Sequence, residues 1–413
     1  MTFNVGIGST LIASYTDYGI PYLWKSGDIT TTPSNETKIT DDGTQSGTEF
    51  GVSVAVGSCR IVVGAWRSDV GSNTDQGSAY IFNLDGNQLG IITASNGAAY
   101  DFFGHSVAVG DGRIVVGAYG NDDNGSFSGS AYIFDLDGNQ LGIITASDAA
   151  GGDHFGYSVA VGCGRIVVGA RYNDVGSNSN QGSAYIFDLD GNQLGIITAS
   201  NGAASDYFGY SVAVGSGRIV VGAPYDDVGP KVNQGSAYIF NLNGNQLGII
   251  TASDGAAYDN FGWSVAVGSG RIVVGAPYDD NTLYAINDHG SIYIFDLNGN
   301  QLEKIISPNG VAGDLFGDAV AVGSGRIVVG ARGVDVGSNT DQGSAYIFDL
   351  DGNQLEIITA SDPTAGDLFG ESVAVGSGRI VVGTASSAYI YETPQVYTLY
   401  DAIDMQSVGI TTL

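Results

Sequence analysis

The sequence predicts an all-β protein, a β-propeller whose blades are four-stranded antiparallel sheets. The first observation is a repeat: the dipeptide Phe-Gly recurs every 52 to 55 residues, at Phe50, Phe103, Phe155, Phe208, Phe261, Phe316 and Phe369. Each interval holds four short runs rich in Val, Ile, Tyr and Phe, and Gly-containing turns separate these runs. Four strands in every repeat of this length are typical of a propeller blade.

The first strand of each unit has two different faces. In the stretch from Phe50 to Val56, strict alternation places Phe50, Val52, Val54 and Val56 on one face, and the small residues between them on the other. Blades that stack face to face need a bulky row that fits against a small row. The strand therefore predicts radial stacking of sheets.

The turns predict the path of the chain. Pairs such as Ser216-Gly217 separate the first and second strands, and pairs such as Asp85-Gly86 separate the third and fourth. These residues favour two-residue turns with positive φ. Each unit is then two hairpins joined by a longer loop. Both tight turns fall on one rim, the plain rim, and the longer loops fall on the opposite side, the long-loop face, where binding is expected.

The number of blades has two interpretations. Residues 3–40 read as a degenerate unit would give eight blades. Alternatively, the last unit, which ends near Tyr391 without an Asp-Gly turn, takes its outer strand from Thr37 to Thr40 and closes seven blades. We expect seven. Residues 1–40 are thus a segment that completes or adds a blade, 41–394 the propeller, and 395–413 a C-terminal tail.

The units resemble the FG-GAP repeats of the integrin α head, and more closely their bacterial and viral relatives. The shared motifs are Phe-Gly-x-Ser-Val-Ala, Ile-Val-Val-Gly-Ala followed by Pro224 or Pro277, and Gly-Ser-Ala-Tyr-Ile-Phe, over residues 41–391. This resemblance implies a recognition or adhesion module without enzymatic activity. Integrin repeats carry an Asp-rich calcium site between strands one and two. Here that loop is a short turn such as Val214 to Arg218, so those ligands do not carry over.

Composition excludes several partners. The chain of 413 residues has 14 Lys plus Arg against 43 Asp plus Glu, a net charge of −29, which excludes a nucleic-acid partner. No apolar run approaches the roughly 18 residues of a membrane-spanning helix, so membrane insertion is not expected. The start lacks the basic and apolar regions of a secretory signal. Acidity without such a signal fits a virion or cell-surface protein better than a purely cytoplasmic one.

Candidate binding residues are those that differ between nearly identical units. The residues after each Gly-Ala diverge, and they place aromatic and Arg side chains on the long-loop face: Trp66, Arg67, Tyr119, Arg171, Tyr172, Tyr225, Tyr278 and Arg332. Both residue types are enriched at binding hot spots, so we expect them to bind a protein or a glycan. The alternative is that they only cover the tops of the blade interfaces.

Candidate metal ligands lie in a long loop that three units share, the third being Asp174 to Gly182, where Asn180 stands in the last ligand position. Oxygen-bearing side chains alternate with small residues there, at Asp69, Asn73 and Asp75 and again at Asp335, Asn339 and Asp341. Calcium prefers such ligands. Asx turns within the loop explain the same residues. No cofactor is required by the sequence, and calcium is the one ion considered.

Other repeated residues are interpreted as architecture. One Arg follows the first turn of every unit, at Arg60, Arg113, Arg165, Arg218, Arg271, Arg326 and Arg379, beside acidic turns. An Asp two residues before Phe, as at Asp206, is expected to cap the turn. His105, His154 and His289 occupy unrelated positions and assemble no catalytic set, so we expect no enzyme.

A second hypothesis places the protein in a larger assembly. In this interpretation the chain is a structural component, such as a phage capsid or tail protein, and the propeller is an exposed spacer. The tail from 395 to 413 is apolar beyond what an exposed end needs, and it would be the anchor.

Overall fold

The computed structural model describes residues 36–393, with gaps at 42, 44, 281–287 and 308–309, and four short strands before residue 24. The chain forms two compact units, Met1–Ser34 and Asn35–Leu413. In the first unit, β1 (Gly6–Ile7) pairs with β2 (Ser9–Thr10) and β3 (Ala13–Tyr15) with β4 (Pro21–Leu23). The described residues contain no helix that could cross a membrane.

The second unit is a propeller of seven four-stranded blades. From the first blade to the seventh, the strands are β6 (Phe50–Gly57), β7 (Arg60–Ala65), β8 (Ser78–Phe82), β9 (Gln88–Ile92); β10 (Ser106–Gly110), β11 (Arg113–Ala118), β12 (Ser130–Phe134), β13 (Gln140–Ile144); β14 (Phe155–Gly162), β15 (Arg165–Ala170), β16 (Ser183–Phe187), β17 (Gln193–Ile197); β18 (Ser211–Gly215), β19 (Arg218–Ala223), β20 (Ser236–Asn241), β21 (Gln246–Ile250); β22 (Ser264–Gly268), β23 (Arg271–Ala276), β24 (Ser291–Phe295), β25 (Gln301–Ile306); β26 (Ala319–Gly323), β27 (Arg326–Ala331), β28 (Ser344–Phe348), β29 (Gln354–Ile358); β30 (Ser372–Gly376), β31 (Arg379–Gly383), β32 (Ala388–Glu392), β5 (Thr37–Ile39).

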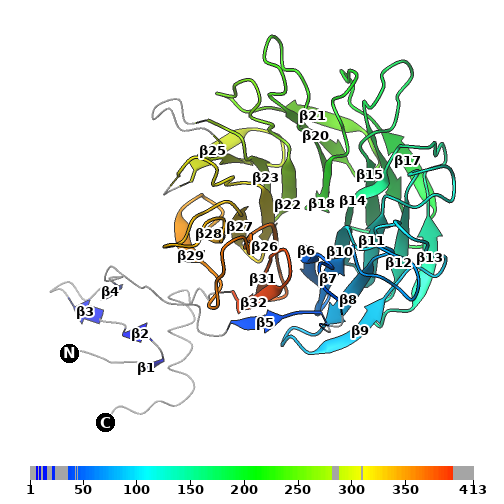
Figure 1. The fold of residues 1–413 in the computed structure, drawn as a ribbon. Helices are drawn as coiled ribbons and strands as arrows, with labels where there is room; N and C mark the ends of the chain where they lie inside the picture. The colour runs from blue at the N-terminus through cyan, green and yellow to red at the C-terminus, as the bar shows by residue number, and fades with distance from the viewer. Residues whose placement is uncertain are drawn as a thin grey trace. The chain divides into compact units, whose positions relative to one another are not determined.

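The first strand of each blade lies nearest the centre. Strands β6, β10, β14, β18, β22, β26 and β30 each contact the first strand of the next blade, and β30 contacts β6, so the ring is closed (Figure 1). The tight turns have the predicted geometry: Gly110 pairs with Arg113, and Asp111 and Gly112 between them have φ of 49° and 74°.

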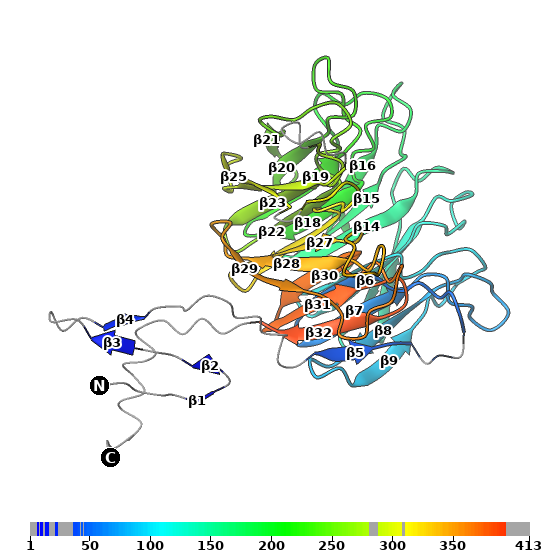
Figure 2. The same cartoon turned by 60° about the vertical axis from the view of Figure 1, so that its left-hand side comes forward.

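Closure of the ring settles the number of blades. In the seventh blade β5 pairs with β32, with Ile39 opposite Ala388 and Lys38 opposite Tyr389 (Figure 2). Lys38 Nζ also lies 2.7 Å from an Asp362 carboxylate oxygen. The prediction of seven blades closed by residues 37–40 is confirmed, and the eight-blade interpretation is wrong. The ring closes with seven blades because Thr37–Ile39 supplies the outer strand that the last repeat lacks.

The core lies between blades rather than at the centre of the ring. Each Phe of a Phe-Gly pair is fully buried, and Phe155 meets the rings of Tyr185 and Phe187 edge-on at 5.3 and 6.0 Å. On the small face of the first strand, Ala55 of β6 lies in one buried cluster with Val107 of β10, and Val109 packs against this cluster. The predicted fit of a bulky row against a small row is therefore confirmed at these positions. The second strands also approach closely, because a Cβ added to Gly117 would lie only 2.0 Å from the carbonyl oxygen of Gly156 in the next blade.

The repeated Arg binds the neighbouring blade. Arg165 Nε donates a hydrogen bond to the carbonyl oxygen of Leu242, in the plain-rim turn of the following blade, at 3.1 Å. The architectural role is thus confirmed, although each Arg holds the next blade and not its own edge. The same bond, at 3.0 to 3.1 Å, is made by Arg60, Arg113, Arg218, Arg271 and Arg379.

A second repeated bond joins the blades nearer the axis. Ser158 Oγ donates to the carbonyl oxygen of Gly209 in the next Phe-Gly pair, at 2.8 Å. Equivalent bonds of 2.7 to 2.8 Å are donated by Ser53, Ser106, Ser211, Ser264 and Ser372. The interface between blades six and seven has neither bond: Ala319 replaces the Ser, and Arg326 Nε is buried without a hydrogen-bond partner among the described residues.

The Asp before each Phe-Gly caps its turn as predicted. Asp206 accepts a hydrogen bond from the backbone N–H of Ala203, three residues earlier, at 2.6 Å. Asp101, Asp153, Asp259, Asp314 and Asp367 do the same in their units. These carboxylates, which are buried except for the half-buried Asp367, fix the turn that leads into each Phe.

Candidate functional site

A ring of variable side chains surrounds the axis at the long-loop face. The position after Phe-Gly is the variable one in an otherwise constant motif, and we call its residues the axial ring: Val52, His105, Tyr157, Tyr210, Trp263, Asp318 and Glu371. The sequence analysis missed this ring. Its signal was present, because the residue differs in every unit except for two Tyr.

The backbone explains why these side chains leave the sheet. In β14 the register with β15 shifts between Phe155 and Ser158, so Gly156 and Tyr157 stand outside the regular ladder. Gly156 has a φ of 89°. Such a bulge re-aims a side chain. The same shift occurs between Phe50 and Ser53, so the predicted placement of Val52 on the face of Phe50 is wrong.

Neighbouring members of the axial ring contact each other. The centroids of His105 and Tyr157 are 4.8 Å apart, those of Tyr157 and Tyr210 5.4 Å, and those of Tyr210 and Trp263 4.8 Å. These residues lie at or just before the start of the innermost strands of successive blades. Their contacts therefore run around the axis from blade two to blade five.

Predicted binding residues form a second tier on the axial ring. Trp66 and Tyr119 lie 5.8 and 4.7 Å from the His105 ring. The guanidinium carbon of Arg171 lies 3.6 Å from the centroid of Tyr157 and 5.5 Å from that of Tyr210. Each of these residues follows a Gly-Ala pair, so the structure brings the divergent positions together as expected from the topology.

The remaining predicted aromatics extend the cluster outward. Tyr172 lies 4.6 Å from His154, and Tyr225 lies 4.9 Å from Tyr207, where His154 and Tyr207 each stand just before a Phe-Gly pair. Tyr278 lies 5.4 Å from the axial Trp263. Arg67 stacks 4.5 Å over Trp66. The rings therefore make a continuous chain of contacts from blade one to blade five.

Burial determines the charge of the histidines in this cluster. Burial, with a smaller effect from the nearby charge of Arg171, lowers the pKa of both His105 and His154 to about 4. Both rings are neutral at pH 7. His105 Nδ1 lies 3.3 Å from the carbonyl oxygen of Tyr157. Trp66 Nε1 and Arg171 Nε are buried and have no hydrogen-bond partner among the described residues.

Arg332 lies in a different environment. Its Nε is 3.0 Å from an Asp318 carboxylate oxygen and its Nη1 is 3.6 Å from one of Glu371, so it bridges axial residues of blades six and seven. Burial raises the pKa of Asp318 to about 6. Burial, with the charges of Asp318 and Glu49 adding to it, raises the pKa of Glu371 to about 7. We call Asp318, Arg332 and Glu371 the ion triad.

Comparison with known families agrees with this geometry. A family model described as the FG-GAP repeat matches seven segments of the chain: 33–82, 87–134, 139–187, 192–240, 245–295, 300–348 and 353–397. The chain belongs to the FG-GAP repeat family. Each matched FG-GAP segment starts one strand before its blade, and the first includes β5, which explains why an N-terminal strand completes the last blade.

Two further comparisons were made. No curated protein matches the chain. Among solved structures, the chain is similar to BamB from Moraxella catarrhalis, with a TM-score of 0.43 and 10% identity over 84% of each chain.

The predicted calcium loops of this FG-GAP protein are held by their own hydrogen bonds. Asp69 accepts from the backbone N–H of Asp75 at 2.9 Å, and Asp335 accepts from that of Asp341 at 2.9 Å. Asn73 and Asn339 donate to Gln side chains three residues later, Gln76 and Gln342. In the described part of the chain, no three Asp, Glu, His or Cys side chains are grouped as metal ligands. Asx turns account for these bonds, and calcium stays a prediction.

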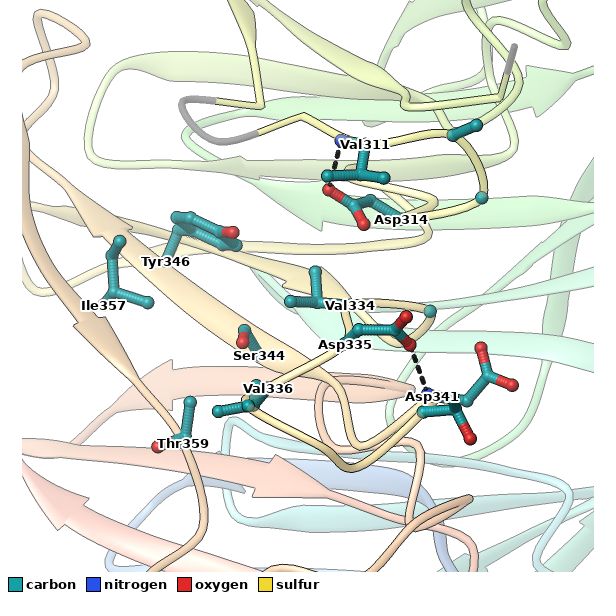
Figure 3. Close-up of a pocket in the computed structure, with 15 residues that line it drawn as sticks. Val311, Asp314, Val334, Asp335, Val336, Asp341, Ser344, Tyr346, Ile357 and Thr359 are labelled. Atoms are coloured by element: carbon teal, nitrogen blue, oxygen red, sulfur yellow. Dashed lines mark hydrogen bonds between the residues drawn. The ribbon is translucent and has the colours of Figure 1, made fainter. Parts of the chain in front are cut away.

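One of these loops borders a groove of about 640 Å³ on blade six (Figure 3). Val311 and Asp314 line one side and Val334 and Asp335 the other, and Tyr346 also lines the groove, at the left in this view. Units three and four have Asn173 and Asp226 at the place of Val334. Those side chains bond to neighbouring polar groups, whereas Val334 makes the groove partly apolar.

Proposed function

We propose that this FG-GAP protein is a recognition or adhesion module without enzymatic activity. It binds a protein or a glycan through the long-loop face, on a virion or cell surface. One observation carries the proposal. The seven units share most of their strand residues, yet the positions after Phe-Gly and after Gly-Ala vary, and side chains at these positions contact one another around the axis. Varied side chains that meet at the long-loop face support binding there.

Exposed aromatic residues at the same face support this proposal. Tyr100 and Tyr258, in the loops that lead into two Phe-Gly pairs, are 53% and 60% exposed. Both have positive φ, 68° and 72°, which costs free energy for a residue other than Gly. Strained, exposed aromatic residues gather at ligand sites, where they offer large contact areas.

The histidines support a role without catalysis. His105 and His154 contact aromatic rings, and His289 Nδ1 lies 2.9 Å from the carbonyl oxygen of Asp279. A catalytic base instead needs a nucleophile or substrate proton within hydrogen-bond reach.

The test compares the full chain with the double variant Trp66→Ala and Tyr172→Ala on a glycan array and on candidate cells. Since both residues belong to the cluster, we expect at least a tenfold loss of binding. Cys163→Ser is the control, because Cys163 is exposed in a plain-rim turn, away from this face, and units four to seven have Ser at that position. Equal binding by the double variant would contradict the proposal, provided that its melting temperature shows it is folded.

A second candidate, a structural component of a larger assembly, is supported by the perimeter. Outer strands of six blades expose Leu and Ile, namely Leu89, Ile91, Leu141, Ile143, Leu194, Ile196, Leu247, Ile249, Leu302, Ile306, Leu355 and Ile357. Exposed apolar edge strands favour association. The predicted anchor, 395–413, lies outside the described residues. Sedimentation of Leu194→Lys with Leu247→Lys, and of a chain ending at residue 394, tests this candidate, which predicts loss of association in both.

A further inference from the structure

We propose that Arg171 is the anion-binding group of the long-loop face, and that it receives the carboxylate of an acidic saccharide. This inference deepens the proposed recognition function and rests on it. It selects a glycan over a protein, and within glycans a sugar that carries one carboxylate.

The first support is how Arg171 is held. Its guanidinium lies over three tyrosine rings, 3.6 Å from the centroid of Tyr157, 4.5 Å from Tyr172 and 5.5 Å from Tyr210. These contacts fix the plane of the guanidinium without using its N–H donors. Its Nε is buried and has no hydrogen-bond partner among the described residues. A fixed guanidinium with unused donors is prepared for a planar anion.

The second support is the contrast with the other cations. The repeated Arg residues bond to carbonyl oxygens, while Lys38, Lys304 and Arg332 pair with carboxylates. Lys231 Nζ donates to the carbonyl oxygen of Gly255. Within the described ranges, Arg171 and Arg67 are the cations held by aromatic rings and by no acid. In a chain with a net charge of −29, two cations without acidic partners on one face are unexpected.

The charges of Arg67 and Arg171 both affect the side chain of Tyr119. Burial raises the pKa of Tyr119, and the nearby charges of Arg171 and Arg67 both oppose that rise. Tyr119 therefore lies within the field of both cations. The neighbouring His105 and His154 are neutral above about pH 4, because burial lowers their pKa. The positive charges that act on Tyr119 are therefore those of the two Arg side chains.

The ligand class follows from this chemistry. A planar guanidinium donates two parallel hydrogen bonds to a carboxylate. The flat, half-buried rings of Trp66, Tyr119 and Tyr172 offer apolar surfaces that suit the C–H face of a sugar ring. The surrounding negative charge repels polyanions such as acidic peptides. A saccharide with a single carboxylate, such as a hexuronic or nonulosonic acid, satisfies all three conditions.

The test measures binding of matched oligosaccharides to the full chain by calorimetry. One oligosaccharide ends in an acidic sugar, and its partner is the same compound as the methyl ester. We expect the ester to bind at least tenfold more weakly, since a charge-assisted bidentate contact is lost. The Arg171→Met variant should bind acid and ester equally, and Arg171→Lys should recover only a small part of the preference. Cys163→Ser should behave as the unchanged protein, because Cys163 is exposed in a plain-rim turn where units four to seven have Ser.

The outcomes separate this inference from the proposed function. Equal binding of acid and ester by the unchanged protein, or an acid preference that survives in folded Arg171→Met, overturns the inference and leaves the recognition function standing. Binding of sulfated saccharides or acidic peptides alone overturns it as well. If the unchanged protein binds no saccharide or protein at all, the recognition function fails and the inference fails with it.

Discussion

Arg171 and Arg332 occupy the same position of the repeat, directly after Gly-Ala, and each contacts the axial residues of its own blade and of the next. The neighbours of Arg171 are Tyr157 and Tyr210, whereas those of Arg332 are Asp318 and Glu371. The axial residues therefore determine which interactions the Arg side chain makes. Between tyrosines its donors stay available, and between carboxylates it becomes a bridge.

The blade interfaces explain this division. Between blades three and four, Ser158 and Arg165 already join the sheets, so Arg171 is not needed there. Between blades six and seven, Ala319 lacks the hydroxyl group, and Arg326 has no Asp-Gly turn to meet, because β5 replaces the usual fourth strand. The ion triad crosses this interface. The triad joins these two blades, whereas at the other interfaces the blades are joined by the hydrogen bonds of the repeated Ser and the repeated Arg.

The largest expected effect comes from Arg332→Met. At pH 8 both triad carboxyls are charged, and loss of the cation leaves two buried like charges, so we expect destabilisation of about 3–5 kcal/mol. At pH 5 the cost should be much smaller, because the raised pKa values of Asp318, about 6, and Glu371, about 7, leave both carboxyls mainly protonated. Urea unfolding at the two pH values measures this difference.

Arg171→Met is the matched control for that experiment. It removes a cation held only by rings, so we expect a cost of about 1 kcal/mol that is similar at both pH values. Equal costs for the two Arg variants, or a cost of Arg332→Met that does not depend on pH, would contradict the division between bridge and binding group.

A smaller effect is expected from Glu371→Gln. The pKa of Glu371 is raised from its ordinary 4.5 to about 7, so the folded protein binds the proton more tightly than the unfolded chain. This group therefore makes the protein lose stability as pH rises from about 4.5 to 7. The amide removes that loss, and we expect a gain of about 2 kcal/mol at pH 8 and none at pH 4.

The measurement is the difference between the unfolding free energies of Glu371→Gln and the unchanged protein, taken across pH 4 to 8. A difference curve is needed because Asp206 and Asp259, whose pKa values burial raises to about 6, contribute slopes of the same sign. A difference curve that does not change with pH would show that Glu371 does not lower the unfolding free energy as the pH rises.

Much of the fold follows from local chemistry and could be predicted. Turn pairs such as Asp111-Gly112 specify hairpins by themselves, and a missing turn after Tyr391 is enough to predict that another segment completes the blade. The bulge at Phe-Gly could not be predicted from alternation, because two extra residues, Gly156 and Tyr157 in β14, stand outside the ladder. For that reason the axial ring was missed.

The candidate site was predictable only in part. Divergence after Gly-Ala located Trp66, Tyr119 and Arg171 on one face, and the contacts among them agree with that placement. Divergence could not separate Arg171 from Arg332, because the two repeats look alike around them. Their roles depend on axial side chains of the following repeats, Tyr210 and Glu371, which lie some 39 residues further along in each case.

The smallest expected effect tests whether the ion triad compensates for a missing bond. Ala319→Ser would restore the hydroxyl group that six other interfaces have. Its acceptor is in place: a Cβ on Gly330 would lie 1.9 Å from the carbonyl oxygen of Gly370, the same approach as between Gly64 and Gly104, where Ser53 makes its bond. We expect a gain of about 1 kcal/mol in the unfolding free energy, and Ser211→Ala should lose a similar amount.

Combining Ala319→Ser with Arg332→Met makes this test decisive. If the hydroxyl group and the ion triad hold the same interface, the cost of Arg332→Met at pH 8 should be lower in the Ala319→Ser background by an interaction energy of about 0.5–1 kcal/mol. Strict additivity of the two substitutions would mean that the triad stabilises only its own carboxylates. Arg332 would then be a local charge partner and not a substitute for the repeated bond between blades.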